Sequence, residues 1–128
     1  MNGCILTFDY GYTAKINQNT LQSVRNHKYA NPLENIGSTD ISSHVNFKLV
    51  AEILENNHLN VKKIITQNEF LQKMGINNRA NIISKDISFK EKAKLFYQLK
   101  KLVDIEHMGG LFKVLLAQKK GEKFNLGF

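Results

Sequence analysis

The residues near the start of the chain that could do chemistry are Asp9, Tyr10 and Gly11, which directly follow an apolar run at residues 4–8. A carboxylate can accept a proton, and a phenol can donate a hydrogen bond. A continuous apolar run of this length is typical of a strand covered on both faces, and ligands of open α/β sheets bind just beyond the carboxyl ends of such strands. The run therefore predicts a central strand with a site at its end. The alternative is a simple turn, in which Gly11 supplies a positive φ.

The segment 13–45 holds the remaining candidates for acid–base chemistry. It has no periodic apolar pattern and is rich in turn-forming Asn and Gly. A structureless loop of this length inside a compact domain is uncommon and usually functional, so we expect it to lie over the Asp9 end as a lid or binding loop. No pair of its residues has metal-ligand spacing, so no metal site is expected. Together with Asp9 and Tyr10, the predicted catalytic residues are His27, Glu34, Asp40 and His44.

Length and charge limit the function classes. The 128 residues are 42% hydrophobic, which suits one domain with a modest core, and the formal net charge is +7. A basic surface can bind phosphates, but only Arg25 and Arg79 among the 18 basic residues are arginine, the side chain that reads base edges best. We therefore interpret the lysines as solvated surface rather than as a phosphate groove, and expect no specific nucleic-acid partner.

The termini and the cysteine content indicate a soluble, cytoplasmic protein. No apolar run approaches the roughly 20 residues of a membrane span, and no basic region precedes the first apolar stretch as in a secretory signal. Cys4 is the only cysteine, so a disulfide framework is excluded. We predict that Cys4 is a small apolar filler within a buried strand rather than a nucleophile.

Helix signals become clear after residue 45. Asn46 is a good N-cap for a helix whose apolar residues recur at 47, 50, 51 and 54 and which stops at residues 56–57. Residues 61–65 predict a short strand, and Thr66 to Glu69 has the form of a capping box for a short helix that ends at Gly75.

The last third of the chain predicts one long helix and one strand. Residues 76–87 look irregular, and Ser88 to Glu91 is a second capping box. Residues 108–110 predict a turn, 111–117 a last strand and 119–128 a tail. The face of the long helix that we expect to point inward consists of Phe89, Ala93, Phe96, Leu99 and Val103.

These elements predict an α/β layer with three strands, which is few for a complete sheet. The opening strand would have no neighbour along one edge, and an uncovered apolar edge is a docking surface or an aggregation hazard. No glycine-rich nucleotide loop of the GxGxxG type is present. The chain therefore resembles part of a larger sheet.

Several segments, in order and spacing, resemble the C-terminal portion of the MidA-type S-adenosylmethionine-dependent methyltransferases, a family that includes a mitochondrial complex I assembly factor that methylates arginine. The resemblance covers nearly all 128 residues. The chain departs from the family pattern at Asn19, Val24, Asn46 and Gly110, where glycine, an aromatic residue and two acids are usual. The matching segments lie at 8–12, 20–27, 31–33, 37, 40–47, 66–76 and 108–114.

The resemblance implies the C-terminal part of a Rossmann-like class I methyltransferase sheet. Residues 4–8 would be its fifth strand, residues 61–65 the sixth, and residues 111–117 the antiparallel seventh lying between them. The first four strands, with the turn that holds the cofactor, would be absent, so this chain alone is expected to bind no cofactor. A separate N-terminal chain that completes the sheet, and a protein substrate, are the partners implied.

Two functions from different classes follow. One is the substrate-side, C-terminal fragment of a (protein arginine) methyltransferase, inactive alone, in which Asp9, Tyr10 and the loop carboxylates position the substrate. The other is a non-catalytic basic binding module that keeps the architecture.

Overall fold

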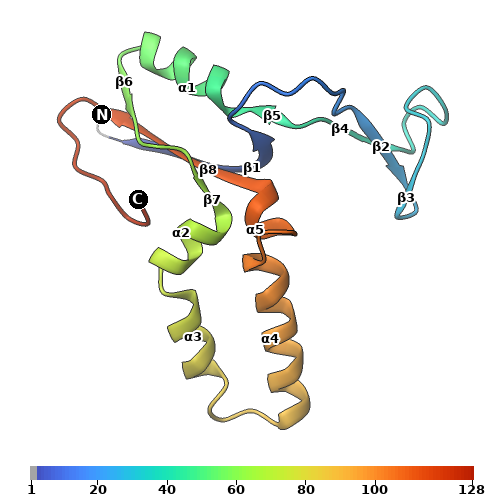
Figure 1. Cartoon of the computed structure of the whole chain (residues 1–128), viewed down its shortest axis with the longest axis vertical. Coiled ribbons are helices and arrows are strands. Elements are labelled where there is room, and N and C mark those ends of the chain that lie inside the picture. The colour runs from blue at the N-terminus through green and yellow to red at the C-terminus, as the bar shows by residue number, and fades with distance from the viewer. Residues whose placement is uncertain (1–2) are drawn as a thin grey trace.

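The structure is a computed structural model that describes residues 3–128 (Figure 1). Its main sheet is organised around β8 (Phe112–Lys119). This strand is antiparallel to β1 (Cys4–Tyr12) on one side and to β6 (Leu59–Val61) and β7 (Ile65–Thr66) on the other. The last strand therefore lies between the other two, as the resemblance implied, and the predicted strand at 61–65 is divided into two shorter ones.

The prediction that the first strand is covered on both faces is wrong for this chain. Ile5, Leu6 and Phe8 are 48%, 42% and 41% exposed, and Cys4 is exposed rather than a buried filler. Within residues 3–128 the outer edge of β1 is paired only at its end, where β5 (Val45–Asn46) meets Gly11 and Tyr12. The buried strand is β8 instead, where the side chains from Val114 to Gln118 are at most 1% exposed.

Gly11 is required by a close approach and not by a turn. The strand β1 continues through residues 9–11 to Tyr12, so the turn alternative is wrong. A Cβ atom on Gly11 would lie 2.8 Å from Cδ2 of Phe47 and would overlap the carbonyl oxygen of Val45. Only glycine lets β5 and the start of the next helix pack this closely against β1.

Each face of β8 carries one small core. On one face, Phe47 from α1 (Phe47–Asn56) packs with Leu115 and Ala117. The Asn46 side chain caps α1 by accepting a hydrogen bond from the Leu49 backbone N–H at 3.2 Å. The predicted helix, its cap and its apolar face at Val50, Ala51 and Leu54 are therefore confirmed.

The opposite face of β8 carries an aromatic core. Phe70 from α2 (Gln67–Lys73) packs with Ile65 and Val114, and its ring centroid lies 4.9 Å from that of Phe8 and 5.7 Å from that of Phe128. Thr66 is the N-cap of α2 and accepts a hydrogen bond from the Glu69 N–H at 3.1 Å. The N-cap at Thr66 is as predicted. In place of the second half of the predicted capping box, the Glu69 carboxylate forms an ion pair with Lys73 at 3.3 Å.

The segment 13–45 is not structureless, because it folds into a second, three-stranded sheet that extends away from the main sheet (Figure 1). Its strands, in the order β3-β2-β4, are β2 (Gln22–Arg25), β3 (Lys28–Tyr29) and β4 (Asp40–Ser42). The hairpin between β2 and β3 has both loop residues, Asn26 and His27, at positive φ, which is the geometry of a type I′ turn. We call this unit the small sheet.

A second projection is the helical arm, formed by α3 (Ile76–Ile83) and α4 (Phe89–Val103) (Figure 1). The expectation that residues 76–87 are irregular is wrong, because α3 forms and buries Ala80. The capping box at Ser88 and Glu91 is confirmed. The predicted inward face is wrong at the free end of α4, where Phe89 is 88% and Phe96 37% exposed. Leu99 faces α3 as predicted, and the rest of that face is formed by Leu95, Gln98 and Leu102.

The base of the helical arm is fixed to α2, which packs on the main sheet. Gln67 donates a hydrogen bond to the carbonyl of Leu102 at 2.9 Å, and Asn68 donates one to Val103. The predicted turn at 108–110 is a short helix, α5 (Met108–Leu111), that leads into β8. No helix among residues 3–128 is long and apolar enough to span a bilayer.

Candidate functional site at the end of β1

An aromatic group lies at the carboxyl end of β1. The ring centroid of Tyr10 is 5.7 Å from that of His44 and 5.7 Å from that of Phe112, with interplanar angles of 70° and 83°. His44 comes from the segment before β5, and its backbone N–H donates to Oγ1 of Thr20 at 3.2 Å. Tyr10 and Phe112 face each other across the β1–β8 ladder. Two of the predicted site residues, Tyr10 and His44, are thus in contact.

Asp9 lies on the opposite face of the same strand, because successive side chains alternate along a strand. Its Oδ1 accepts a hydrogen bond from the Tyr10 backbone N–H at 2.8 Å, and its cross-strand partner is Lys113. Burial lowers the pKa of the Lys113 ammonium, which donates to the carbonyls of Gly110 and Leu111. Asp9 and Lys113 are therefore cross-strand neighbours on this face, with the partly desolvated ammonium turned toward the Gly110 and Leu111 carbonyls.

The other three predicted site residues lie in the small sheet. His27 is at the exposed hairpin tip, Glu34 is exposed and accepts a hydrogen bond from the Asn31 side chain at 3.2 Å, and Asp40 is in β4. The chain does not gather them around Tyr10, because the small sheet points away from β1 (Figure 1). Their catalytic role stays a prediction.

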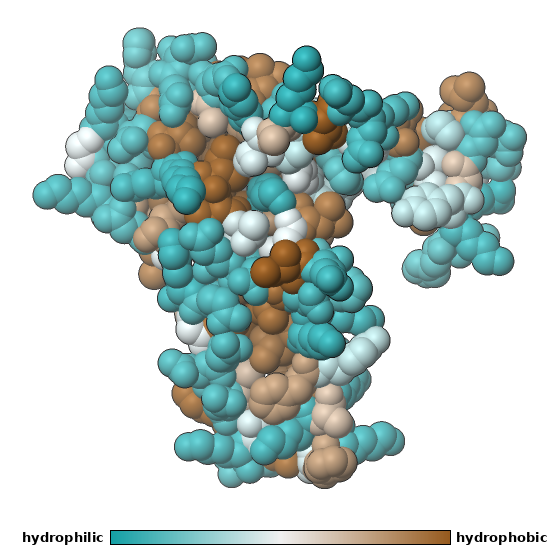
Figure 2. Space-filling model, viewed as in Figure 1, coloured by the Kyte–Doolittle hydropathy of each residue, from teal (hydrophilic) through white to brown (hydrophobic). Residues whose placement is uncertain are grey.

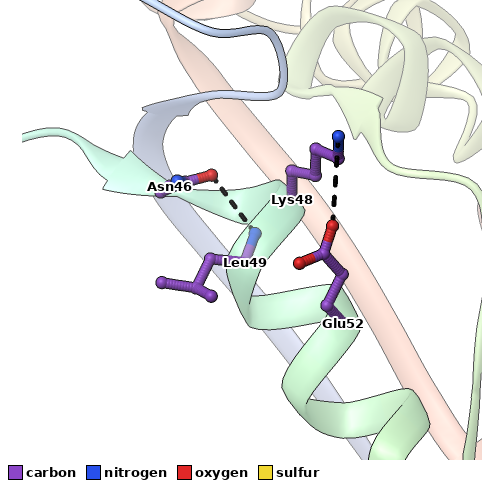
Figure 3. A network of polar contacts seen from close by, with 4 residues as sticks. All are labelled: Asn46, Lys48, Leu49 and Glu52. Atoms are coloured by element: carbon purple, nitrogen blue, oxygen red, sulfur yellow. Dashed lines mark hydrogen bonds and ion pairs between the residues drawn. The ribbon is translucent and has the colours of Figure 1, made fainter.

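Beyond the ends of the parallel strands β1 and β5 there is a hollow of about 410 Å³. Its polar side chains are Thr13, Lys15, Asn46 and Lys48, and the hollow opens beside the N-terminus of α1. Figure 3 shows Asn46 bonded to Leu49, and Lys48 paired with Glu52 at 3.9 Å on the exposed side of the helix. The carboxyl ends of strands are where α/β sheets bind ligands.

Sequence reasoning missed Phe112 and Lys113, which complete the two faces of this site. The signal that could have found them is the antiparallel register, because pairing residues 4–8 with the last apolar run places these two beside Asp9 and Tyr10. Within residues 3–128, no group of three or more His, Cys, Asp or Glu side chains is arranged to hold a metal ion.

Comparison with solved structures places the fold among α/β methyltransferase-like proteins. An uncharacterised protein from Burkholderia thailandensis superposes with a TM-score of 0.86 and 24% identity, over 98% of this chain and 35% of that one. A related protein from the same organism, solved with S-adenosyl-homocysteine bound, gives a TM-score of 0.84 and 23% identity over 98% of this chain and 34% of that one. At this identity the likeness defines the fold.

The sequence model of the S-adenosyl-L-methionine-dependent methyltransferase family matches residues 1–65, half of the chain. The chain belongs to this family, of the MidA type. One relative is the mitochondrial protein arginine methyltransferase NDUFAF7 of Xenopus tropicalis, which is 29% identical over 114 residues. That alignment covers 87% of this chain and 26% of the relative, so the chain spans about a quarter to a third of the proteins it matches.

The end of β1 does not carry the glycine-rich turn that holds a nucleotide cofactor. A nucleotide cofactor is held by a glycine-rich turn between a strand and a helix, where the backbone can approach it. The glycine at the end of β1 is Gly11, and that space is filled by Val45 and Phe47.

Proposed function

We propose that this chain is the C-terminal, substrate-side part of an S-adenosylmethionine-dependent protein methyltransferase and that it is inactive alone. The single observation that carries the proposal is the state of β1. The strand ends in the site residues, yet among residues 3–128 no strand pairs with its outer edge from Cys4 to Tyr10. In a complete methyltransferase sheet that edge would pair with the strands that bind the cofactor. We propose that a separate N-terminal chain supplies those strands.

In this proposal the end of β1 orients the side chain that is methylated. An arginine substrate is supported by the name of the Xenopus relative and by the residues at hand. A guanidinium can donate hydrogen bonds to the second oxygen of Asp9 on one face of β1, or can lie against the aromatic rings of Tyr10 and Phe112 on the other face. The proposal gives His44, whose ring lies 5.7 Å from that of Tyr10, the role of proton acceptor.

Cofactor binding tests the proposal. We expect the 128-residue chain alone to give no heat with S-adenosylmethionine in calorimetry, and binding to appear when a candidate N-terminal chain is added. A micromolar dissociation constant for the isolated chain, about −8 kcal/mol, would overturn the inactive-fragment proposal.

The site residues are tested in the reconstituted enzyme. We expect Asp9→Asn to lower kcat about 10²- to 10⁴-fold with a small effect on KM, because the carboxylate acts on the reacting group. The control is Asp86→Asn, the same chemical change at an exposed residue between α3 and α4. Equal activity of the two variants would exclude Asp9 from the site.

The second candidate function is a non-catalytic basic binding module, favoured by the charge of +7. It predicts that no N-terminal chain restores cofactor binding.

A cytoplasmic location also stays a prediction.

A further inference from the structure

The helical arm contains an open apolar groove between its two helices. The groove has a volume of about 270 Å³ and is lined mainly by apolar side chains. On each helix the lining residues have the spacing i, i+3, i+4, i+7, so each contributes one continuous helical face. These residues are Ile76, Arg79, Ala80 and Ile83 on α3, and Leu95, Gln98, Leu99 and Leu102 on α4.

The apolar faces of α3 and α4 do not fully bury each other. Of the lining residues only Ala80 is buried, while Ile83 remains 43% and Leu102 37% exposed. In Figure 2 a hydrophobic strip runs along the arm between hydrophilic borders. Apolar surface left exposed in this way, with a polar rim, is typical of an interaction site.

The helical arm as a whole is strongly basic, and Arg79 lies in the lining of the groove. Residues 76–103 contain seven basic residues and two acidic ones, a net charge of +5 within the chain's total of +7. None of these basic side chains is joined to a carboxylate within residues 3–128, since the Lys48–Glu52 and Lys73–Glu69 pairs lie outside the arm. Lys101 lies over the ring of Tyr97 at 4.7 Å. The positive charge of the arm is therefore available to a partner.

We propose that the helical arm is a docking site for an acidic, amphipathic helix of a partner protein. The apolar face of that helix would fill the groove, as in helix-in-groove recognition, and its carboxylates would face the lysines and Arg79. A helix matches the length and straightness of a groove between two helices, and an apolar floor is a poor surface for nucleic acid, which is held by charge and by stacking on aromatic rings. The proposal concerns the arm and does not depend on the proposed catalytic function.

The experiment measures binding of a fluorescently labelled peptide to the full chain by anisotropy. The probe is a designed helix of about 18 residues, with leucines on one face and glutamates on the other. We expect micromolar binding that weakens as salt is raised, because the lysines are exposed and screened. A scrambled peptide of the same composition, and a version with lysine in place of glutamate, should each bind at least about tenfold more weakly.

Two neighbouring isoleucines provide a matched pair of variants. Ile83 lines the groove, whereas Ile82, 66% exposed, does not. We expect Ile83→Asp to weaken peptide binding at least about tenfold and Ile82→Asp to leave it unchanged, with circular dichroism unchanged for both.

Four outcomes would overturn the proposal. They are equal loss in the two variants, equal binding of the scrambled peptide, stronger binding of duplex DNA than of the acidic peptide, and a dimer in sedimentation that Ile83→Asp alone dissociates. The last would assign the groove to a second copy of the chain. A fifth such outcome is displacement of the peptide by an N-terminal methyltransferase chain, which would assign the groove to the rest of the enzyme.

Discussion

At the scale of single residues, Gly11 shows how closely the end of β1 is packed. Replacing it by alanine should destabilise the chain by about 1–3 kcal/mol, because the new methyl group would press on Val45 and the Phe47 ring. Urea unfolding followed by circular dichroism measures this. Gly3→Ala is the control, since nothing lies within 4 Å of a Cβ there, and it should change the free energy of unfolding by less than about 0.5 kcal/mol. Equal effects would mean that β5 does not pack on β1 in solution.

The capping box of α4 gives a pH prediction. The pKa of the Glu91 carboxyl lies below its ordinary value, because the Ser88 hydroxyl and then the Ser88 backbone N–H donate hydrogen bonds to it. A lowered folded-state pKa means that this stabilisation is complete above the ordinary carboxyl value and is lost as the pH falls through the folded-state value. In Ser88→Ala, NMR titration should therefore find the pKa of Glu91 returned toward its ordinary value.

At the scale of elements, the aromatic core under α2 separates buried from exposed phenylalanine. Phe70 is 6% exposed and contacts Phe8 and Phe128, so Phe70→Ala should cost about 3–5 kcal/mol. Phe89→Ala removes the same ring from a position that is 88% exposed and should cost less than about 0.5 kcal/mol. Chemical denaturation of the two variants gives both values. A large cost for Phe89 would mean that something covers the free end of α4 in solution.

Local signals predicted most elements of the main unit. The caps at Asn46, Thr66 and Ser88 depend on residues three apart, so the sequence displays them directly, and each is found where expected. Apolar spacing also identified the buried face of α1.

Features that depend on distant contacts were not predictable in the same way. The helix α3 is rich in asparagine, which is a poor helix former. It is stabilised by packing of the buried Ala80 on the side that faces α4. Phe89, Ala93 and Phe96 have the spacing of a buried helical face. However, α4 carries a second apolar face at Leu95, Leu99 and Leu102, and the spacing alone does not say which of the two faces packs against α3. In the same way, Asp9 and Tyr10 were predictable as the end of a strand, whereas the approach of His44 to Tyr10 depends on the path of the small sheet.

At the scale of the whole molecule, the outer edge of β1 should control assembly. Along this edge Leu6 is 42% exposed, so Leu6→Lys should leave the fold of the isolated chain intact. It should abolish association with an N-terminal chain that completes the sheet, because the assembled sheet would bury an unpaired charge. Size-exclusion chromatography with light scattering measures both states.

The wild-type chain alone is expected to self-associate or to melt at low temperature, since an unpaired apolar edge seeks a partner. A cooperative monomer of ordinary thermal stability, with association unaffected by Leu6→Lys, would contradict the role assigned to this edge.

The pairing of β1 with β8 also sets the order of events during synthesis. Cys4 pairs with Gln118 and Tyr10 with Phe112, so β1 leaves the ribosome about 100 residues before β8, its long partner strand within residues 3–128. At translation rates of about 5–20 residues per second, the inner edge of β1 waits about 5–20 s for this partner. Until β8 emerges, the nascent chain presents an adhesive strand that a chaperone or a second subunit can capture first.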